Sequence, residues 1–345
     1  MPGGDRRRQR RSRRAGAHRR PPALLTTSRS IGIDVGGTKC LGVLLDEAGG
    51  VVLERRVATP GGADALLDAI VRVALALGCS PAVPIGLGMP GLVDDEGVLA
   101  FAANLEGVVD LPVRANLERR LVGVAVTVDN DANCAAWAEY RQGAARGFTH
   151  AVLATLGTGI GGGVISGGRL VRGAHGFAGE IGHMVVDPDG PPCPCGKRGC
   201  WERFASGDGL GRLGREAAGG GSAAGARIVE LAGGRADDVR GEHVTRAAAE
   251  GDDGAVEVVG RFAWWLALGL ANLANLLDPD RFVIGGGLVE AGDLLLAPAR
   301  RAFAQLLQGS EHRPDVAIVP AEMGERAGAV GAALLGAVRS GGQDA

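Results

Sequence analysis

Short apolar runs of strand length alternate along the chain with longer amphipathic segments. Residues 29–58 predict three strands, divided by a Gly-Gly turn and by the turn EAGG. The segments 62–78 and 113–122 have the periodicity of helices, whereas PIGLGM and VGVAVTVDND predict strands, the second followed by a helix. The alternation continues in the second half, where a long apolar helix is expected at about 255–277. Strands that alternate with helices are typical of an α/β fold.

The opening strand-turn-strand pattern occurs twice. IDVGGTKCLGV at 33–43 and ATLGTGIGGGV at 154–164 lie 121 residues apart (154 − 33), and at this offset Gly42 falls on Gly163. Each hairpin opens a block of strands and helices, which predicts a duplicated domain. We expect a small α/β domain over 29–148, a large α/β domain over 149–324, and a C-terminal helix over 325–340 that packs back on the small domain.

The charge is distributed unevenly. The formal net charge is −2, but residues 1–20 hold nine arginines and one aspartate, which leaves 28 basic (37 − 9) and 38 acidic (39 − 1) residues in the remainder. A body with a net charge of −10 (28 − 38) predicts no specific nucleic-acid partner. The arginine-rich arm, residues 1–28, is expected to be a disordered appendage, although such a run could also touch nucleic acid or an anionic surface.

Neither the N-terminal segment nor the most apolar stretch of the chain predicts secretion or a membrane span. The N-terminus is rich in arginine rather than in apolar residues, so it does not resemble a signal peptide. The most apolar stretch, 262–277, is interrupted by Asn272 and Asn275 and is expected to be too short to span a bilayer. The six cysteines form no regular disulfide framework. A reducing cytoplasm fits these features best.

Three of the six cysteines lie together in PCPCGKRGCWERF, residues 192–204. Cys193, Cys195 and Cys200 are close enough in sequence for one loop to wrap a metal ion, and Gly196 and Gly199 allow the turns. Three thiols do not complete a tetrahedral site, and a redox pair or inert thiols remain alternatives.

Three glycine-rich loops favour a ligand that carries phosphates. DVGGTK and LGTGIGGG are turns within hairpins, and GGG at 285–287 lies between a strand and a helix. Backbone N–H groups approach phosphate oxygens only where no Cβ intervenes. DVGGTK lacks the spacing of a Walker A loop, and each loop alone could be a plain turn, but the three together predict a phosphotransferase. The candidate nucleotide-binding residues are Asp34, Gly36, Gly37, Thr38, Lys39, Gly157, Thr158, Gly159, Gly285, Gly286 and Gly287.

Carboxylates beside these loops are candidates for the chemistry. Phosphoryl transfer to a hydroxyl needs a carboxylate that takes up the proton. Asp131 in DNDAN stands at a strand-to-helix junction, where it, Asp129 or Asn130 could instead cap the helix. Asp34 is better placed to hold Mg²⁺ through water. Lys39 could neutralise phosphate or form a surface ion pair.

DVGGTK, DNDAN, LGTGIGGG, GEIGH and CPCGKRGCWE, in this order and spacing, resemble the ROK family (repressors, open reading frames and sugar kinases). The resemblance covers roughly residues 29–340, and within the family it is strongest to glucokinases of the actinobacterial type. It implies the actin/hexokinase-like ATPase fold, with two duplicated α/β domains around a cleft. It also implies ATP-dependent phosphorylation of glucose to glucose 6-phosphate with Mg²⁺, and a structural Zn²⁺.

The resemblance also assigns residues. It implies that Asp131 is the general base and that zinc is held in the loop 183–202. The implied zinc ligands are His183, Cys193, Cys195 and Cys200. The implied sugar-binding residues are Asn104, Asn130, Asp131, Glu180, His183 and Glu202.

Other functions of the same family stay open. One is a kinase for N-acetylmannosamine, fructose or allose, and another is a kinase that uses polyphosphate. A sugar-responsive transcriptional regulator is disfavoured, because a winged helix-turn-helix is expected before the sugar domain and only about 28 residues precede the first strand here. We expect glucose and ATP as partners and a homo-oligomer, either a dimer or a tetramer.

Overall fold

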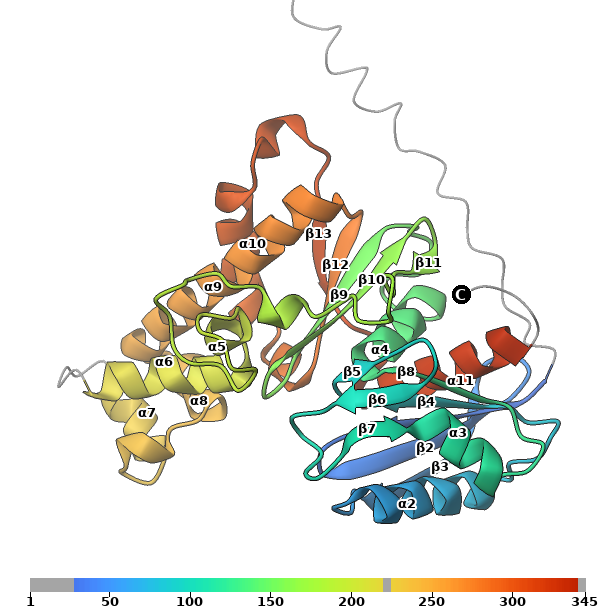
Figure 1. The fold of residues 1–345 in the computed structure, drawn as a ribbon. Helices are drawn as coiled ribbons and strands as arrows, with labels where there is room; N and C mark the ends of the chain where they lie inside the picture. Colours follow the sequence, from blue (N-terminus) through green and yellow to red (C-terminus); the bar gives the residue numbers. More distant parts are fainter. Residues whose placement is uncertain (1–27, 220–224, 341–345) are drawn as a thin grey trace, which may run out of the picture.

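The computed structural model describes residues 28–219 and 225–340 (Figure 1). Apart from Ser28, the predicted arm at 1–28 lies outside the described residues. Two five-stranded sheets form the framework, one in each half of the chain.

The sheet of the first half has the strand order β3-β2-β1-β4-β8. Its strands are β1 (Ser30–Val35), β2 (Lys39–Leu45), β3 (Val51–Ala58), β4 (Ile85–Met89) and β8 (Val126–Asn130). A smaller antiparallel sheet lies beside it and consists of β5 (Leu92–Val93), β6 (Val98–Phe101) and β7 (Val109–Pro112). The helices of this half are α2 (Ala63–Ala76), α3 (Val113–Arg120) and α4 (Asp131–Arg141).

The sheet of the second half has the order β11-β10-β9-β12-β13. Its strands are β9 (Ala151–Leu156), β10 (Ile160–Ser166), β11 (Arg169–Leu170), β12 (Arg281–Gly285) and β13 (Ala317–Pro320). In the order in which they lie in each sheet, the first three strands are antiparallel to their neighbours. The last two strands are parallel to the third, so the two sheets have the same topology. The duplication and the α/β fold class predicted from the sequence are thereby confirmed.

The register of the two hairpins corrects the sequence alignment by one position. Ile33 pairs with Gly42, whereas Ala154, its counterpart, pairs with Gly162. The turn of the second hairpin is therefore one residue shorter, and Gly42 corresponds to Gly162 rather than to Gly163. The two glycine turns are related in position but not identical in shape.

Helices pack around and between the sheets (Figure 1). The second half contributes α5 (Glu202–Ala205), α6 (Gly207–Gly219), α7 (Ala226–Leu231), α8 (Gly241–Ala249), α9 (Asp253–Leu277) and α10 (Asp293–Leu306), and the chain continues into α11 (Ala327–Ser340). Helix α11 packs on β1 and β4 of the first sheet and against α4, which in turn contacts β9 and β10. These two helices therefore lie where the halves of the molecule meet.

Two glycines let α11 lie directly on the first sheet. A Cβ on Gly32 would lie 1.8 Å from the carbonyl oxygen of Ala329, and a Cβ on Gly86 would lie 1.7 Å from that of Ala332. No real side chain tolerates such distances, so the helix backbone can approach the strands only because these positions are glycine.

Two segments connect the halves, and both are held by one carboxylate. Glu139, near the end of α4, is 1% exposed. Its side chain accepts hydrogen bonds from the backbone N–H of Ala144 (2.7 Å), Glu322 (2.9 Å) and Met323 (2.8 Å). Ala144 lies in the connection from α4 to β9, and the other two lie in the connection from β13 to α11. A single buried side chain thus joins both connections.

Helix α9 explains the most apolar part of the sequence. It has 25 residues and, by length and composition alone, could cross a membrane, but 56% of its most apolar window is buried inside the molecule. The apolar stretch 262–277 is the C-terminal part of this helix, which begins at Asp253, close to the expected start at about 255. Its buried face, which includes Phe262 and Leu266, belongs to the core of the second half, as in the central helix of a globular domain.

Candidate active site

The junction between β8 and α4 decides which residue of DNDAN caps the helix. Asn130 is the N-cap, and its side-chain oxygen accepts from the backbone N–H of Ala132 (2.9 Å) and Asn133 (3.1 Å). Asp131 is the first residue of α4, and one of its oxygens accepts from the N–H of Ala132 (2.7 Å). The neighbouring asparagine therefore does the capping, and the carboxylate of Asp131 is held at a fixed place at the end of a strand.

Burial makes two carboxyl groups of this region more basic. It raises the pKa of Asp131 to about 6, with a further contribution from the charge of Glu180. It raises the pKa of Asp34 to about 7, with a further contribution from the charge of Asp131. A Cβ on Gly88 would lie 3.3 Å from the Asp34 carboxylate and 3.4 Å from Cα of Asp131, so Gly88 lies between them. A base whose pKa lies near the working pH suits proton transfer.

Asp129, the third carboxylate, has a different environment. It is 6% exposed and pairs with Arg172 at 2.7 Å. Its other oxygen accepts from the Asn133 side chain (3.0 Å) and from the backbone N–H of Asn130 (2.9 Å). Both oxygens are engaged inside the protein, which disfavours Asp129 as the proton acceptor.

The cysteine loop brings four metal-binding side chains together. The ligand atoms of His183, Cys193, Cys195 and Cys200 all lie within 4.8 Å of one another. Cys195 and Cys200 are 3.6 Å apart at sulfur, and Cys193 is 3.7 Å from Nδ1 of His183. Ligands around a tetrahedral zinc, at about 2.0–2.3 Å from the ion, are separated by about 3.3–3.8 Å. The residues present therefore fit a structural zinc ion.

The fold of the cysteine loop depends on glycine and on an anchored tryptophan. Gly196 and Gly199 have φ values of 85° and 68°, and a Cβ on Gly199 would lie 1.5 Å from the Asp187 carbonyl oxygen. Trp201 follows Cys200 directly and is fully buried, and its indole N–H donates to the carbonyl of Trp265 (2.8 Å). The C-terminal end of the cysteine loop is thus attached to the middle of helix α9.

Three of the predicted sugar-binding residues meet at this loop. His183 and Glu180 belong to one 3-10 turn, with Nε2 of the histidine 3.8 Å from the glutamate. The opposite ring nitrogen, Nδ1, lies 3.8 Å from Glu202, which also accepts from Cys193 (3.0 Å). Burial raises the pKa of Glu180. The histidine therefore has one nitrogen toward the cysteines and the other toward Glu180.

The remaining predicted residues lie in the first half. Asn104 is exposed and lies next to Gly37, since a Cβ on that glycine would be 3.3 Å from the asparagine carbonyl. Lys39 pairs with Glu325 at 2.9 Å. Of the two roles expected for this lysine, neutralising phosphate or forming a surface ion pair, this structure contains the ion pair. In Asn130 the side-chain amide donates to the carbonyl of Gly91 (3.0 Å). Gly36 and Thr38 complete the first turn, whose Gly36 carbonyl accepts from Thr59 (2.7 Å).

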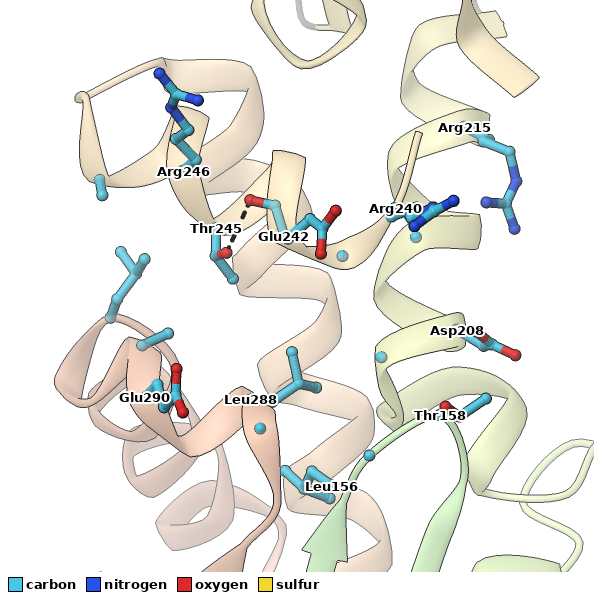
Figure 2. Close-up of a pocket in the computed structure, with 18 residues that line it drawn as sticks. Leu156, Thr158, Asp208, Arg215, Arg240, Glu242, Thr245, Arg246, Leu288 and Glu290 are labelled. Carbon is cyan, nitrogen blue, oxygen red and sulfur yellow. Dashed lines mark hydrogen bonds between the residues drawn. The ribbon is translucent and has the colours of Figure 1, made fainter. Parts of the chain in front are cut away.

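A pocket of about 840 Å³ lies in the second half (Figure 2). Its walls come from the turn of the second hairpin, the first turns of α6, helix α8 and the segment after β12. Of the predicted nucleotide-binding residues it contains Gly157, Thr158 and Gly287. Leu288 and Leu294 give one part of the lining an apolar surface. Charged groups project from α6 and α8 (Figure 2). A planar, partly polar ligand suits such a lining.

Most residues of this pocket were not among the predicted ones. The charged and polar residues outside the predicted set are Asp208, Arg215, Arg240, Glu242, Thr245, Arg246 and Glu290. The pocket is also lined by three glycines, Gly207, Gly211 and Gly241. These glycines could have indicated the pocket from the sequence, since glycine within or at the start of a helix leaves space beside it.

Two further glycines of the predicted nucleotide-binding set lie against other parts of the protein. Gly286 has a φ of 83°, and a Cβ there would lie 2.4 Å from the Leu156 carbonyl oxygen, so the backbone geometry by itself requires glycine here, and its contact with a nucleotide stays a prediction. A Cβ on Gly159 would lie 2.5 Å from Glu202, which places this glycine beside the cysteine loop. Gly285 precedes Gly286 as the last residue of β12.

Comparisons with known proteins agree with this arrangement. The model of the ROK family matches residues 30–338. The chain is 40% identical over 308 residues to a glucokinase of Streptomyces coelicolor, covering 89% of this chain and 96% of that protein. The crystal structure of a ROK family glucokinase from Streptomyces griseus, in complex with glucose and AMPPNP, matches with a TM-score of 0.79 and 41% identity over 90% of this chain and 99% of that one. A ROK hexokinase from Thermus thermophilus matches with a TM-score of 0.75 and 35% identity over 91% and 99% of the two chains. The actin/hexokinase-like fold is thereby confirmed, and the chain belongs to the ROK family.

Proposed function

We propose that this chain is a glucokinase, an ATP-dependent enzyme that phosphorylates glucose to glucose 6-phosphate. The observation that carries the proposal is the position of Asp131. Its carboxylate is held at a strand-to-helix junction, is made more basic by burial, and is close enough to Glu180 to respond to its charge. The similarity to glucokinases over about nine tenths of the chain supports glucose as the sugar.

In this proposal Asp131 is the general base. Its carboxylate takes up the proton of the sugar hydroxyl while the hydroxyl oxygen forms a bond to the γ-phosphorus of ATP. The bond between that phosphorus and the bridging oxygen breaks, and ADP leaves with its electron pair. With a pKa of about 6, the group is mostly ionised at pH 7 and is a stronger base than an ordinary aspartate.

Mg²⁺ would neutralise charge on the phosphates when bound. The carboxylate of Asp34 is the group of the first hairpin that suits it, because Mg²⁺ prefers oxygen ligands. A neighbouring cation would also keep Asp34 ionised, although burial raises its pKa to about 7. Gly36, Gly37 and Thr38 would then present backbone N–H groups to the phosphates.

The zinc ion is proposed to be structural. His183, Cys193, Cys195 and Cys200 supply four protein ligands, which leaves no open position for a substrate. With Nδ1 of His183 on the metal side, Nε2 is oriented toward Glu180 and the sugar site. Asn104, Asn130 and Glu202 complete the proposed set of sugar-binding residues.

The lining of the large pocket favours ATP as the donor. Leu288 and Leu294 offer apolar contact to an adenine ring, which inorganic polyphosphate lacks. Gly157 and Thr158 lie in the same lining and belong to the turn proposed to hold phosphates. We also propose that the enzyme acts in the cytoplasm as a homo-oligomer, a dimer or a tetramer.

A coupled assay with purified protein tests the proposal. Glucose, N-acetylmannosamine, fructose, allose and mannose are each offered with ATP and with polyphosphate. We expect glucose with ATP to have the highest kcat/KM. A higher value for another sugar would assign the enzyme to that sugar, the main alternative, and turnover with polyphosphate alone would refute the interpretation of the apolar pocket.

A further inference from the structure

A buried ion pair lies next to the proposed base but takes no part in the reaction proposed above. Arg172 donates through Nε to Asp129 at 2.7 Å, and the two side chains are 18% and 6% exposed. The two residues belong to different halves of the molecule. Asp129 is in β8 of the first sheet, whereas Arg172 follows β11 of the second sheet.

On one side the pair supports the turn that carries the base. The Asp129 oxygen that does not face Arg172 accepts from the backbone N–H of Asn130 and from the Asn133 side chain. Asn130 caps α4, and Asp131 follows it. The orientation of the Asp129 carboxylate therefore fixes the Asp129–Asn130 peptide and the Asn133 side chain, on either side of the catalytic aspartate.

On the other side the pair fixes a segment that leads to the sugar-binding cluster. The carbonyl of Arg172 accepts from the N–H of Ala178 (3.0 Å), and Glu180 follows two residues later. Gly176 of the same segment lies against the first half, since a Cβ there would be 2.6 Å from the Val93 carbonyl. Only a small cavity of about 10 Å³, lined by Asp94 and the ion pair among others, remains between the two surfaces here. The pair thus lies where both parts of the proposed sugar site are joined.

We propose that Arg172 is a positioning residue for Asp131: through Asp129 it holds the catalytic turn of the first half in register with the sugar-binding segment of the second half. The inference rests on the proposed function. Stability alone is a weak explanation, because the desolvation of two buried charges offsets much of their attraction. A fixed register is a benefit that an ion pair with one defined geometry provides and an apolar contact does not.

The test compares Arg172→Gln, Arg172→Lys, Asp129→Asn and the double variant Arg172→Gln/Asp129→Asn. Arg169→Gln is the matched control, because it removes an exposed arginine from β11, three residues earlier in the same segment. The variants are compared by kcat, by KM for glucose and for ATP, and by calorimetric glucose binding. Circular dichroism first establishes that each variant is folded at the assay temperature.

We expect Arg172→Gln and Asp129→Asn to lower kcat by about 10²-fold, the effect of displacing a catalytic group by about 1 Å. Glucose binding should weaken as well, while KM for ATP stays within about twofold, because the nucleotide pocket lies elsewhere. Since both residues act through one contact, the double variant should be no worse than the more impaired single variant. Arg172→Lys, which keeps the charge, should recover part of the loss.

A kcat within about threefold of wild type in a folded Arg172→Gln or Asp129→Asn variant would overturn the inference. Equal losses in glucose and ATP parameters would also overturn it, since they indicate general damage. If Arg172→Gln does not fold, Asp129→Asn and Arg172→Lys decide by the same criteria. The wild type is assayed first on the sugar panel: a failure there refutes the proposed function, whereas normal wild-type turnover with unimpaired variants refutes only the role of Arg172.

Discussion

The variant Asp131→Asn tests two consequences of a carboxylate at the start of α4: it can take up a proton from the sugar, and its buried charge lowers the stability of the fold. The amide keeps the shape of the side chain and still accepts from the N–H of Ala132, but it cannot take up the proton of the sugar. We expect turnover to fall by about 10²–10⁴-fold, the usual contribution of a general base. We also expect the variant to be more stable than the wild type at neutral pH, because it no longer buries a charge.

The size of the gain follows from the environment of Asp131. Burial, opposed by the bond from Ala132 and assisted by Glu180, raises the pKa from 3.8 to about 6. A pKa difference of about 2 between the folded and the unfolded state corresponds to about 3 kcal/mol in the free energy of unfolding. The folded state binds this proton more tightly than the unfolded state, so the free energy of unfolding of the wild type falls as the pH rises from about 4 to about 6 and then levels off. The gain should be about 3 kcal/mol at pH 7.5 and about half of that at pH 5.

Urea unfolding of wild type and variant at these two pH values measures the gain. Asp253→Asn is the control, because Asp253 also lies in the first turn of a helix but is exposed. Its effect should stay within about 0.5 kcal/mol at both pH values. No gain at pH 7.5, or a gain of equal size at both values, would refute the reasoning from burial.

Three further predictions concern the metal, a glycine and the pocket. Cys195→Ser should lose zinc, measured by atomic emission, and should lose glucose binding but keep ATP binding in equilibrium dialysis; native glucose affinity without zinc would contradict the proposed role of the metal. Gly286→Val should lower the melting temperature, because its Cβ meets the Leu156 backbone at a positive φ, and an unchanged midpoint would contradict this. Arg240→Ala should raise KM for ATP but not for glucose in steady-state assays, and the reverse would place the nucleotide elsewhere.

Features set by local sequence could be predicted well. The hairpins, the strand-to-helix junction at Asp131 and the grouping of the three cysteines each depend on residues within about a dozen positions of one another. The duplication was visible because the same turn chemistry occurs twice. Its alignment was wrong by one residue, because a hairpin register depends on turn length, which glycine-rich sequences do not specify.

Features formed by residues far apart in the sequence could not be predicted. Arg215 on α6 and Arg240 directly before α8 look like ordinary solvated surface residues in the sequence, and only packing brings them to one pocket. The pairing of Asp129 with Arg172 joins two segments 43 residues apart. Gly286 illustrates a different limit, because a glycine required by backbone geometry and one required by a ligand look the same in a sequence.

The hydrogen bonds of Glu139 have a mechanical consequence for the cleft. Both connections between the halves are fastened to one carboxylate, so we expect a rotation of one half against the other to be centred near Glu139. Asp131 lies at the opposite end of the same helix, about 12 Å away along its axis at 1.5 Å per residue. Helix α4 therefore carries the fastening of both connections near one end and the proposed base at the other. The position of the group that must meet the sugar is thus tied, through one rigid helix, to the point where the halves are joined.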